Sequence, residues 1–285
     1  VSGSEALSNV GSAFVGQVEA QIMIKPYISG MTKSELLASM AGSMACIAGG
    51  VMAVYIALGV PAEYLIAASL MAAPGALVIS KIVWPETEVS ETQGNVSLEV
   101  KKTNANLVDA ISHGASDGLK VGLNVIAMLI GFIAIIALLD YVLGKIGAGL
   151  GHLGLTLAFM GIDINTLSLN QILGSLFSLF AWVMGVPGKD IQVAGSLMGT
   201  KMVINEFVAY LDLAKIKETL DPKTLIITSF ALCGFANFSS IAIQVGGIGE
   251  LAPERRTDLA KLGVKALICG TLASYLSATI AGILY

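Results

Sequence analysis

The sequence predicts an all-α protein that crosses a membrane several times. Hydrophobic residues make up 55% and charged residues 13% of its 285 positions, whereas about 25% of the residues in an average soluble domain are charged. The mean hydropathy is +0.81, and the apolar residues fall into blocks of about 20, the length that spans the hydrocarbon core of a bilayer. The net charge of -4, without a basic cluster, gives no reason to expect nucleic-acid binding. The expected partner is therefore a lipid bilayer.

Three blocks are predicted to be plain transmembrane helices. Residues 63–84 and 121–143 are nearly uninterrupted apolar runs, and residues 257–284 form the last span. Each block is long enough to cross the bilayer as one helix, because a helix rises about 1.5 Å per residue.

Two further apolar blocks carry a polar or glycine-containing centre. In residues 34–58 the interruption lies at 45–50, and in residues 224–249 it lies at 233–240. Such centres are typical of transmembrane helices that unwind halfway, where the freed backbone groups face protein or water instead of lipid. We therefore expect two broken helices.

The remaining blocks each resemble two short helices that meet at a polar turn, which predicts re-entrant hairpins. The first covers about residues 4–28 and turns near 16–19, and the second covers about residues 169–210 and turns near 185–188. A hairpin followed by a broken helix would then occur twice. This order is typical of transporters built from inverted repeats, so we expect an inverted-repeat transport core.

The predicted elements divide the chain into four sections. Basic residues such as Lys101 and Lys102 favour a cytoplasmic position for the long connection in the middle of the chain. The sections are 1–84 (first hairpin, broken helix and following span), 85–120 (cytoplasmic loop and amphipathic segment), 121–168 (transmembrane helix and loop) and 169–285 (second hairpin, broken helix and last span).

Two carboxylates fall inside the apolar blocks. Glu19 lies two positions after Gln17 at the first hairpin turn, and Glu206 follows Asn205 late in the second hairpin. A carboxylate at the bilayer centre costs about 2.5 to 3.5 kcal/mol on insertion scales, so such residues are functional candidates. Amides and carboxylates together provide donors and acceptors that suit a nucleobase edge and ribose hydroxyls.

The centre of the second broken helix adds further polar and aromatic candidates. Asn237 and Ser240 are three positions apart and share one helix face, and Phe235 stands beside them. For Asn237 and Ser240 a helix-packing hydrogen bond is the alternative interpretation, and for Phe235 it is ordinary packing. As ligand groups they would complete one polar pocket at the bilayer midplane, with Phe235 stacking on a base.

Six separated motifs, in order and at matching spacing, resemble the concentrative nucleoside transporters. They are residues 16–20 (GQVEA), 24–27 (IKPY), 31–36 (MTKSEL), 85–88 (PETE), 205–210 (NEFVAY) and 231–242 (ALCGFANFSSIA). The resemblance continues through residues 253–256 and 270–282 and so covers nearly the whole chain.

The resemblance implies a homotrimer of symporters in the plasma membrane, for a bacterium the inner membrane, that import nucleosides together with sodium ions or protons and need no other cofactor. Family members carry further transmembrane helices before the first hairpin, so the resemblance also implies an amino-terminally truncated chain. Within the family, the Gln and Glu of the first hairpin contact the base, and the later Glu, Asn and Ser hold the ribose. The implied substrate-binding residues are Gln17, Val18, Glu19, Glu206, Phe235, Asn237 and Ser240. Val18 replaces the usual Thr or Ser, which leaves the base preference open.

The residues that match the family's sodium site depart from it in two places. The matching positions are Ser12, Val15, Cys46 and Ile47. Ser12 replaces an amide and Cys46 replaces a hydroxyl, and sulfur is a poor ligand for a hard cation. Sodium remains favoured by the resemblance. The alternative is proton coupling, with Glu19 or Glu206 as the proton carrier.

Two other kinds of function stay open as alternatives. A passive channel or facilitator for small polar solutes would share the composition of a symporter. An intramembrane enzyme would need a nucleophile or a metal-binding motif at membrane depth, and neither HExxH nor a Ser/His pair occurs in the apolar blocks. We expect a transporter and not an enzyme.

Overall fold

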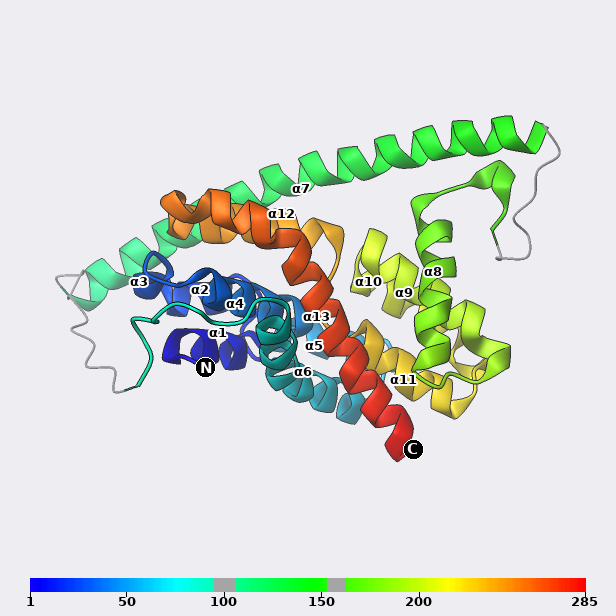
Figure 1. Cartoon of the computed structure of the whole chain (residues 1–285), viewed down its shortest axis with the longest axis horizontal. Coiled ribbons are helices and arrows are strands. Elements are labelled where there is room, and N and C mark those ends of the chain that lie inside the picture. The colour runs from blue at the N-terminus through cyan, green and yellow to red at the C-terminus, as the bar shows by residue number, and fades with distance from the viewer. Residues whose placement is uncertain (95–105, 153–161) are drawn as a thin grey trace.

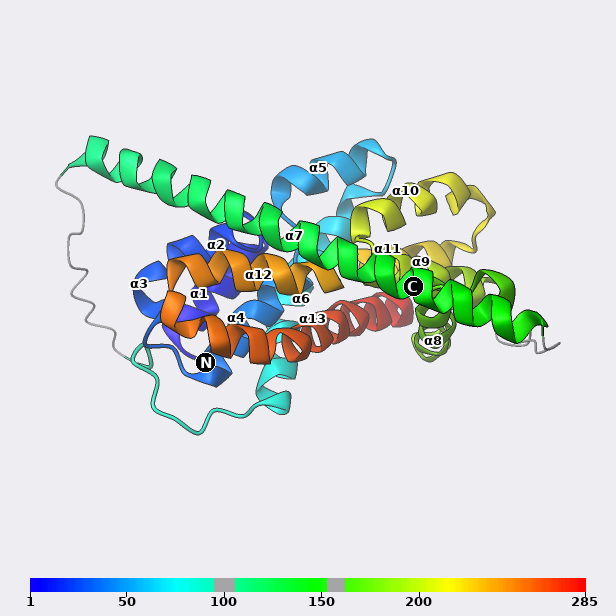
Figure 2. The ribbon, with the colours of Figure 1, turned by 90° about the horizontal axis from the view of Figure 1, so that it is seen from above.

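The computed structural model describes residues 1–94, 106–152 and 162–285, and these residues are helical without a β-strand. Figures 1 and 2 show the arrangement of the helices in two views. The α-helices are α1 (Gly3–Ser12), α2 (Glu19–Met23), α3 (Lys25–Ile28), α4 (Lys33–Ala45), α5 (Gly49–Ala57), α6 (Ala62–Val83), α7 (Leu107–His152), α8 (Leu169–Val183), α9 (Ile191–Val203), α10 (Glu206–Ile216), α11 (Pro222–Leu232), α12 (Phe238–Leu251) and α13 (Arg256–Leu284).

Four helical stretches of the described residues are long and apolar enough to cross a membrane. They are Lys33–Ala57, Ala62–Val83, Ile130–His152 and Pro253–Leu284. The stretches at α6 and α13 agree with the predicted spans 63–84 and 257–284. An all-α protein with several spans is thereby confirmed.

Both predicted broken helices are present. α4 ends where Cys46 adopts an extended backbone, and α5 starts three residues later at Gly49. α11 ends at Leu232, and α12 begins after Asn237, whose side chain caps the new helix by accepting from the Ser240 N–H. A polar cap in the middle of an apolar block explains why the helix restarts there instead of continuing.

α7 is longer than predicted. The span expected at 121–143 lies inside one helix that begins at Leu107, and residues 107–120, which had been assigned to the loop and amphipathic segment, form its first turns. No proline occurs between residues 107 and 152, and each glycine costs a helix only about 1 kcal/mol relative to alanine. The parts of the predicted sections at 95–105 and 153–161 lie outside the described residues. Figures 1 and 2 show α7 running along α12 and past the other helices.

The first hairpin is formed by α1 and α2. Its turn contains Gly16 at φ 121°, a backbone conformation that favours glycine, so the turn lies where it was predicted. The arms touch closely, because a Cβ atom on Gly11 would lie 3.6 Å from the Cβ atom of Ala20. Entry of this hairpin into the membrane from one side remains a prediction.

The second hairpin region has one more reversal than predicted. The expected turn near 185–188 exists between α8 and α9, with Gly185 at φ 87°. A further reversal follows at residues 204–205, where Asn205 caps α10 by accepting from the Val208 N–H. Gln192 at the start of α9 and Ile216 at the end of α10 line the same groove, so α9 and α10 run antiparallel. The hairpin that presents Glu206 is therefore α9–α10, and its tip is not the turn at 185–188.

With this correction the chain shows the same order of elements twice. The first repeat comprises a hairpin (α1–α3), a broken helix (α4 and α5) and a span (α6), and the second comprises a hairpin (α9–α10), a broken helix (α11 and α12) and a span (α13). α4, α6, α11 and α13 pack on one another in the centre.

The breaks of the two broken helices touch. The Phe235 N–H donates to the Cys46 carbonyl at 3.3 Å. Beside it, Gly234 has φ 110°, and a Cβ atom at this position would lie 2.4 Å from the Ala45 carbonyl oxygen. Only glycine fits this contact, which brings both unwound segments together in the core.

Candidate functional site

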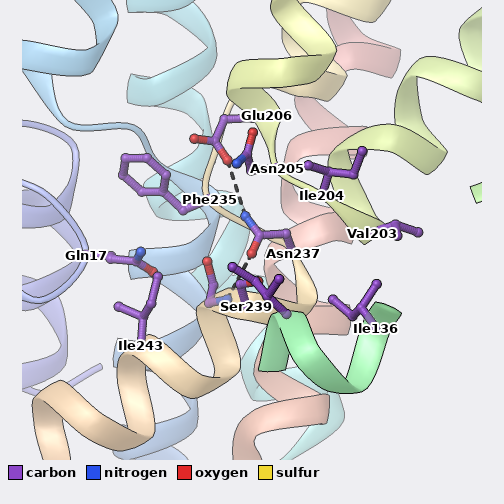
Figure 3. Close-up of a pocket in the computed structure, with 12 residues that line it drawn as sticks. Gln17, Ile136, Val203, Ile204, Asn205, Glu206, Phe235, Asn237, Ser239 and Ile243 are labelled. Carbon is purple, nitrogen blue, oxygen red and sulfur yellow. Dashed lines mark hydrogen bonds between the residues drawn. The ribbon is translucent and has the colours of Figure 1, made fainter. Parts of the chain in front are cut away.

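A cavity of about 470 Å³ opens beside the second break, within the range of 300 to 1,000 Å³ that is usual for small-molecule sites. Its wall comes from the tip of α9–α10, the break between α11 and α12, the first hairpin and one face of α7. The lining residues are Gln17, Ile133, Ile136, Val203, Ile204, Asn205, Glu206, Phe235, Asn237, Ser239, Ser240 and Ile243. Figure 3 draws these side chains around the cavity and labels most of them.

Glu206 is the charged group of this cavity. It is the first residue of α10, where the positive end of the helix dipole stabilises a carboxylate. Its side chain is 5% exposed. Tyr55 Oη donates to Oε1 at 3.0 Å, and Asn237 Nδ2 donates to Oε2 at 3.3 Å. Two donors fix the carboxylate while leaving lone pairs for hydroxyl groups of a ligand.

Asn237 and Ser240 differ in whether their side-chain polar groups already have hydrogen-bond partners. The Asn237 amide is used on both sides, because it also accepts from the Ser240 N–H at 2.9 Å. The Asn237 bond to Glu206 joins two helices, as the packing interpretation expects. Ser240 Oγ is buried and has no hydrogen-bond partner among the described residues. A buried polar atom without a partner costs about 1 to 3 kcal/mol, so Ser240 is a candidate for a ligand bond.

Two further residues complete the cavity wall. Gln17 comes from the first hairpin, and Phe235 comes from the break between α11 and α12. Gln17 Oε1 is buried and, within the described part of the chain, has no hydrogen-bond partner. Figure 3 shows Gln17 reaching into the space that Glu206, Phe235 and Asn237 surround. The cavity thus combines an amide, a ring face, a carboxylate and a hydroxyl.

Val18 and Glu19 do not line this cavity. Val18 packs on α12, because a Cβ atom on Gly247 would lie 2.8 Å from a Val18 methyl group. Glu19 is exposed, and its carboxylate accepts from the Val18 N–H at 3.2 Å. Of the residues that the first hairpin turn was predicted to supply, Gln17 alone reaches the cavity.

Sequence reasoning missed Tyr55 and the isoleucines of α7. Tyr55 is fully buried, and its ring centroid lies 4.4 Å from that of Tyr210. A tyrosine in an apolar block has a hydroxyl that needs a partner, which was the available signal. Ile133 and Ile136 gave no signal, because every face of their segment is apolar.

The four residues predicted to hold sodium lie at the junction of the first hairpin and the first break. The Ser12 hydroxyl lies 2.9 Å from that of Ser43, one turn before Cys46, and the Gly49 N–H donates to the Phe14 carbonyl at 3.0 Å. The Cys46 thiol donates to the Ser69 carbonyl on α6 at 3.6 Å. The oxygen atoms seen in contact at this junction are the Ser12 and Ser43 hydroxyls and the Phe14 carbonyl, and oxygen is the kind of ligand that a hard cation such as sodium prefers.

Comparison with known families gives an unambiguous match. The family described as "Na+ dependent nucleoside transporter C-terminus" matches residues 64–282. The chain belongs to this family. Its members are multi-pass membrane transporters, which agrees with the spans described above.

Several relatives are similar to this chain over nearly its full length. An uncharacterized transporter of Haemophilus influenzae is 46% identical over 287 residues, which cover 98% of this chain and 66% of the relative. Nucleoside permease NupC of Helicobacter pylori is 40% identical, with 98% and 65% covered. Sodium/nucleoside cotransporter 1 of Mus musculus is 39% identical, with 100% and 44% covered. The chain thus spans just under two thirds of the length of its bacterial relatives.

Solved structures give the same result. CNTnw in an inward-facing substrate-bound state is 44% identical, with a TM-score of 0.77, and 99% of this chain and 65% of that chain are covered. A variant of the same protein in an outward-facing state superimposes with a TM-score of 0.84 at 44% identity, with 98% and 64% covered.

Proposed function

We propose that the protein containing this chain imports nucleosides by cation symport, and that the cavity at Glu206 is its nucleoside site. The observation that carries the proposal is a cavity of about 470 Å³ whose wall holds two polar atoms, Gln17 Oε1 and Ser240 Oγ, that find no hydrogen-bond partner in the described parts of the protein. Membership of the family and the names of relatives, which include a nucleoside permease and sodium/nucleoside cotransporters, support the same function.

Each lining group suits one part of a nucleoside. The Gln17 amide pairs with the edge of the base, and Phe235 stacks on its face. The Glu206 carboxylate accepts from two ribose hydroxyls, because charge-assisted bonds of this kind are about twice as strong as neutral ones. Ser240 adds a further ribose bond. Since Gln17 and Glu206 come from different hairpins, the bound nucleoside would connect the two repeats, as alternating access about a midplane site requires.

For the coupling ion we propose sodium at the junction of Ser12, Val15, Cys46 and Ile47, as the names of the mammalian relatives favour. A proton is the second candidate. Two observations support the proton: Glu206 is a buried carboxylate that could carry it, and the Cys46 thiol, which donates to the Ser69 carbonyl of α6, is a poor ligand for sodium. A homotrimer in the plasma membrane completes the proposal.

Uptake by proteoliposomes tests the function. Uridine and adenosine are offered to vesicles that contain the purified protein, with sodium and pH gradients imposed separately. Accumulation above the external concentration with one of the gradients supports symport. Equilibration without accumulation identifies a passive facilitator, and conversion of the nucleoside identifies an enzyme. Accumulation that follows pH and ignores sodium assigns the coupling to protons.

A further inference from the structure

Lys201 is a lysine enclosed in the core of a membrane protein. Its side chain, near the end of α9, is 2% exposed. Its Nζ atom donates to the carbonyls of Ala231 and Cys233 at 2.8 and 3.3 Å. These carbonyls belong to the end of α11 at the second break, where the last carbonyls of a helix lack intrahelical partners and carry negative partial charge. An ammonium group is stabilised at this position.

Lys201 and Ser12 occupy the same place when residues are counted back from the side chain that each hairpin tip presents to the cavity. Lys201 stands five residues before Glu206 in the first arm of the second hairpin, and Ser12 stands five residues before Gln17 in the first arm of the first hairpin. Ser12 was assigned to the coupling-cation site of the first repeat. The position in the second repeat that corresponds to this part of the cation site is therefore held by Lys201.

The two breaks agree in the same way. Cys46 and Cys233 are each the first residue after the first half of a broken helix. Both thiols donate to carbonyls of α6, Cys46 to Ser69 at 3.6 Å and Cys233 to Leu65 at 3.9 Å. The Cys233 carbonyl, which Lys201 contacts, accepts in addition from the Ser274 hydroxyl at 2.9 Å. In both repeats, then, the cysteine at the break contacts α6. The difference is that in the second repeat the Lys201 ammonium lies between the hairpin and the break.

We propose that Lys201 is a tethered cation, which permanently occupies in the second repeat the place that the exchangeable coupling cation takes in the first. This inference rests on the proposed function for its comparison with the first repeat. The ammonium ties the first arm of the hairpin to the end of α11 and balances the charge of Glu206 in the apolar core. Lys201 is thus a positioning residue: it is not among the residues that line the cavity, and it acts by holding Glu206 and the second break in place.

Substitution with rescue tests this role. Lys201→Ala removes the ammonium and leaves space, whereas Lys201→Met fills the space without a charge. We expect both variants to bind uridine at least about ten-fold more weakly, because buried carbonyls lose their donor. Methylammonium at millimolar concentrations should restore binding by Lys201→Ala and not by Lys201→Met. Lys215→Met, at an exposed position of α10, is the matched control and should bind as the unsubstituted protein does.

Three outcomes would overturn the tethered cation: normal uridine affinity in Lys201→Met, absence of amine rescue in Lys201→Ala, or equal rescue of both variants. Where Lys201→Ala does not stay monodisperse in detergent, the readout is recovery of the monodisperse peak and of the melting temperature by methylammonium, and no recovery contradicts the proposal. This thermal readout needs no nucleoside. Failure of the unsubstituted protein to bind uridine would therefore disprove the proposed function separately from the role of Lys201.

Discussion

The two hairpin tips have similar topology and different chemistry. The tip of the first repeat brings the neutral Gln17 to the cavity and leaves its carboxylate, Glu19, exposed, whereas the tip of the second repeat brings Glu206 itself. The second tip can do so because Asn205 caps α10 and places Glu206 at the helix amino terminus. One repeat thus contributes a charge and the other an amide, which suits an asymmetric ligand with a base at one end and a ribose at the other.

The same contrast extends to the hairpin arms. In the first repeat a neutral chain links hairpin to broken helix: Ser39 Oγ donates to Gln21 at 2.8 Å, and Gln21 Nε2 donates to Ser43 Oγ at 2.7 Å. In the second repeat the corresponding link is the ammonium of Lys201. Neutral hydroxyls and amides can rearrange around an incoming ion, whereas a tethered ammonium stays. The comparison therefore supports the proposal that the coupling ion exchanges in the first repeat and that the charged contact to the substrate comes from the second.

The comparison predicts its largest effect at the two carboxylates. Glu206→Gln should reduce concentrative uridine uptake by about 100-fold or more while the protein stays folded, because an amide keeps one bond but loses the charge-assisted pair to ribose. Glu19→Gln is the matched control from the other tip and should change uptake by less than about three-fold, since an exposed side chain contributes little. Initial rates in proteoliposomes measure both. Equal losses of uptake in the two variants would show that Glu19 also contributes to the substrate site.

At the second break we expect smaller losses that differ in size. Asn237→Ala removes a donor to Glu206 and the cap of α12, and Ser240→Ala removes one hydroxyl; an unpaired polar group costs about 1 to 3 kcal/mol. Uridine affinity measured by calorimetry should fall about 30-fold for Asn237→Ala and about ten-fold for Ser240→Ala. Unchanged affinity in both variants would support the helix-packing interpretation instead.

Much of this architecture was predictable from local pattern. Apolar blocks of sufficient length gave α6 and α13, and polar centres gave both breaks, because an unwound helix needs side chains that satisfy its backbone. Among the proposed ligand residues, the cost of a buried carboxylate drew attention to Glu206, which the structure places in the cavity wall.

The rest depended on tertiary structure. The reversal at Asn205 carries no glycine or proline, so the chain resembles one continuous apolar helix up to Glu206. The outward orientation of Glu19 follows from the geometry of one turn, which composition does not fix. The hydrogen bond from Tyr55 to Glu206 joins residues 151 positions apart in the sequence, and a local sequence pattern cannot predict which residue such a tyrosine contacts.

The proposed ion junction of the first repeat can be tested by restoring the oxygen ligands that Ser12 and Cys46 replace. Ser12→Asn with Cys46→Ser restores an amide and a hydroxyl oxygen to the proposed ion junction, and oxygen suits sodium better than sulfur does. We expect the sodium concentration for half-maximal uptake to fall about three- to ten-fold, which corresponds to about 1 kcal/mol. Uptake at constant pH over a sodium series measures it. Uptake that follows pH and stays indifferent to sodium in the double variant would contradict the sodium assignment.

The smallest effect concerns how the two broken helices begin. α4 is capped locally, because Thr32 and Glu35 form a reciprocal capping box. α11 also has a local cap, since Asp221 accepts from the Lys223 N–H at 3.0 Å. In addition, Asp190 from the α8–α9 connection holds the start of α11, because its Oδ2 accepts from the Asp221 N–H at 2.9 Å and from Thr224 Oγ1 at 2.7 Å. Burial raises the pKa of Asp190, but these two bonds and the nearby Lys189 outweigh it, and the pKa lies below its usual value of 3.8.

A carboxyl whose pKa is lower in the folded than in the unfolded state stabilises the fold above its unfolded pKa, and this contribution is lost as the pH falls through the folded pKa. Asp190→Asn should therefore lower stability by about 1 kcal/mol at pH 7, since the amide can replace only part of the two bonds. The difference in melting temperature between variant and unsubstituted protein should shrink as the pH falls below about 4. A melting-temperature difference of constant size from pH 7 to pH 3 would show that Asp190 acts through packing. A larger loss of stability on substituting Thr32 would show that the start of α4, in the first repeat, is the more sensitive of the two.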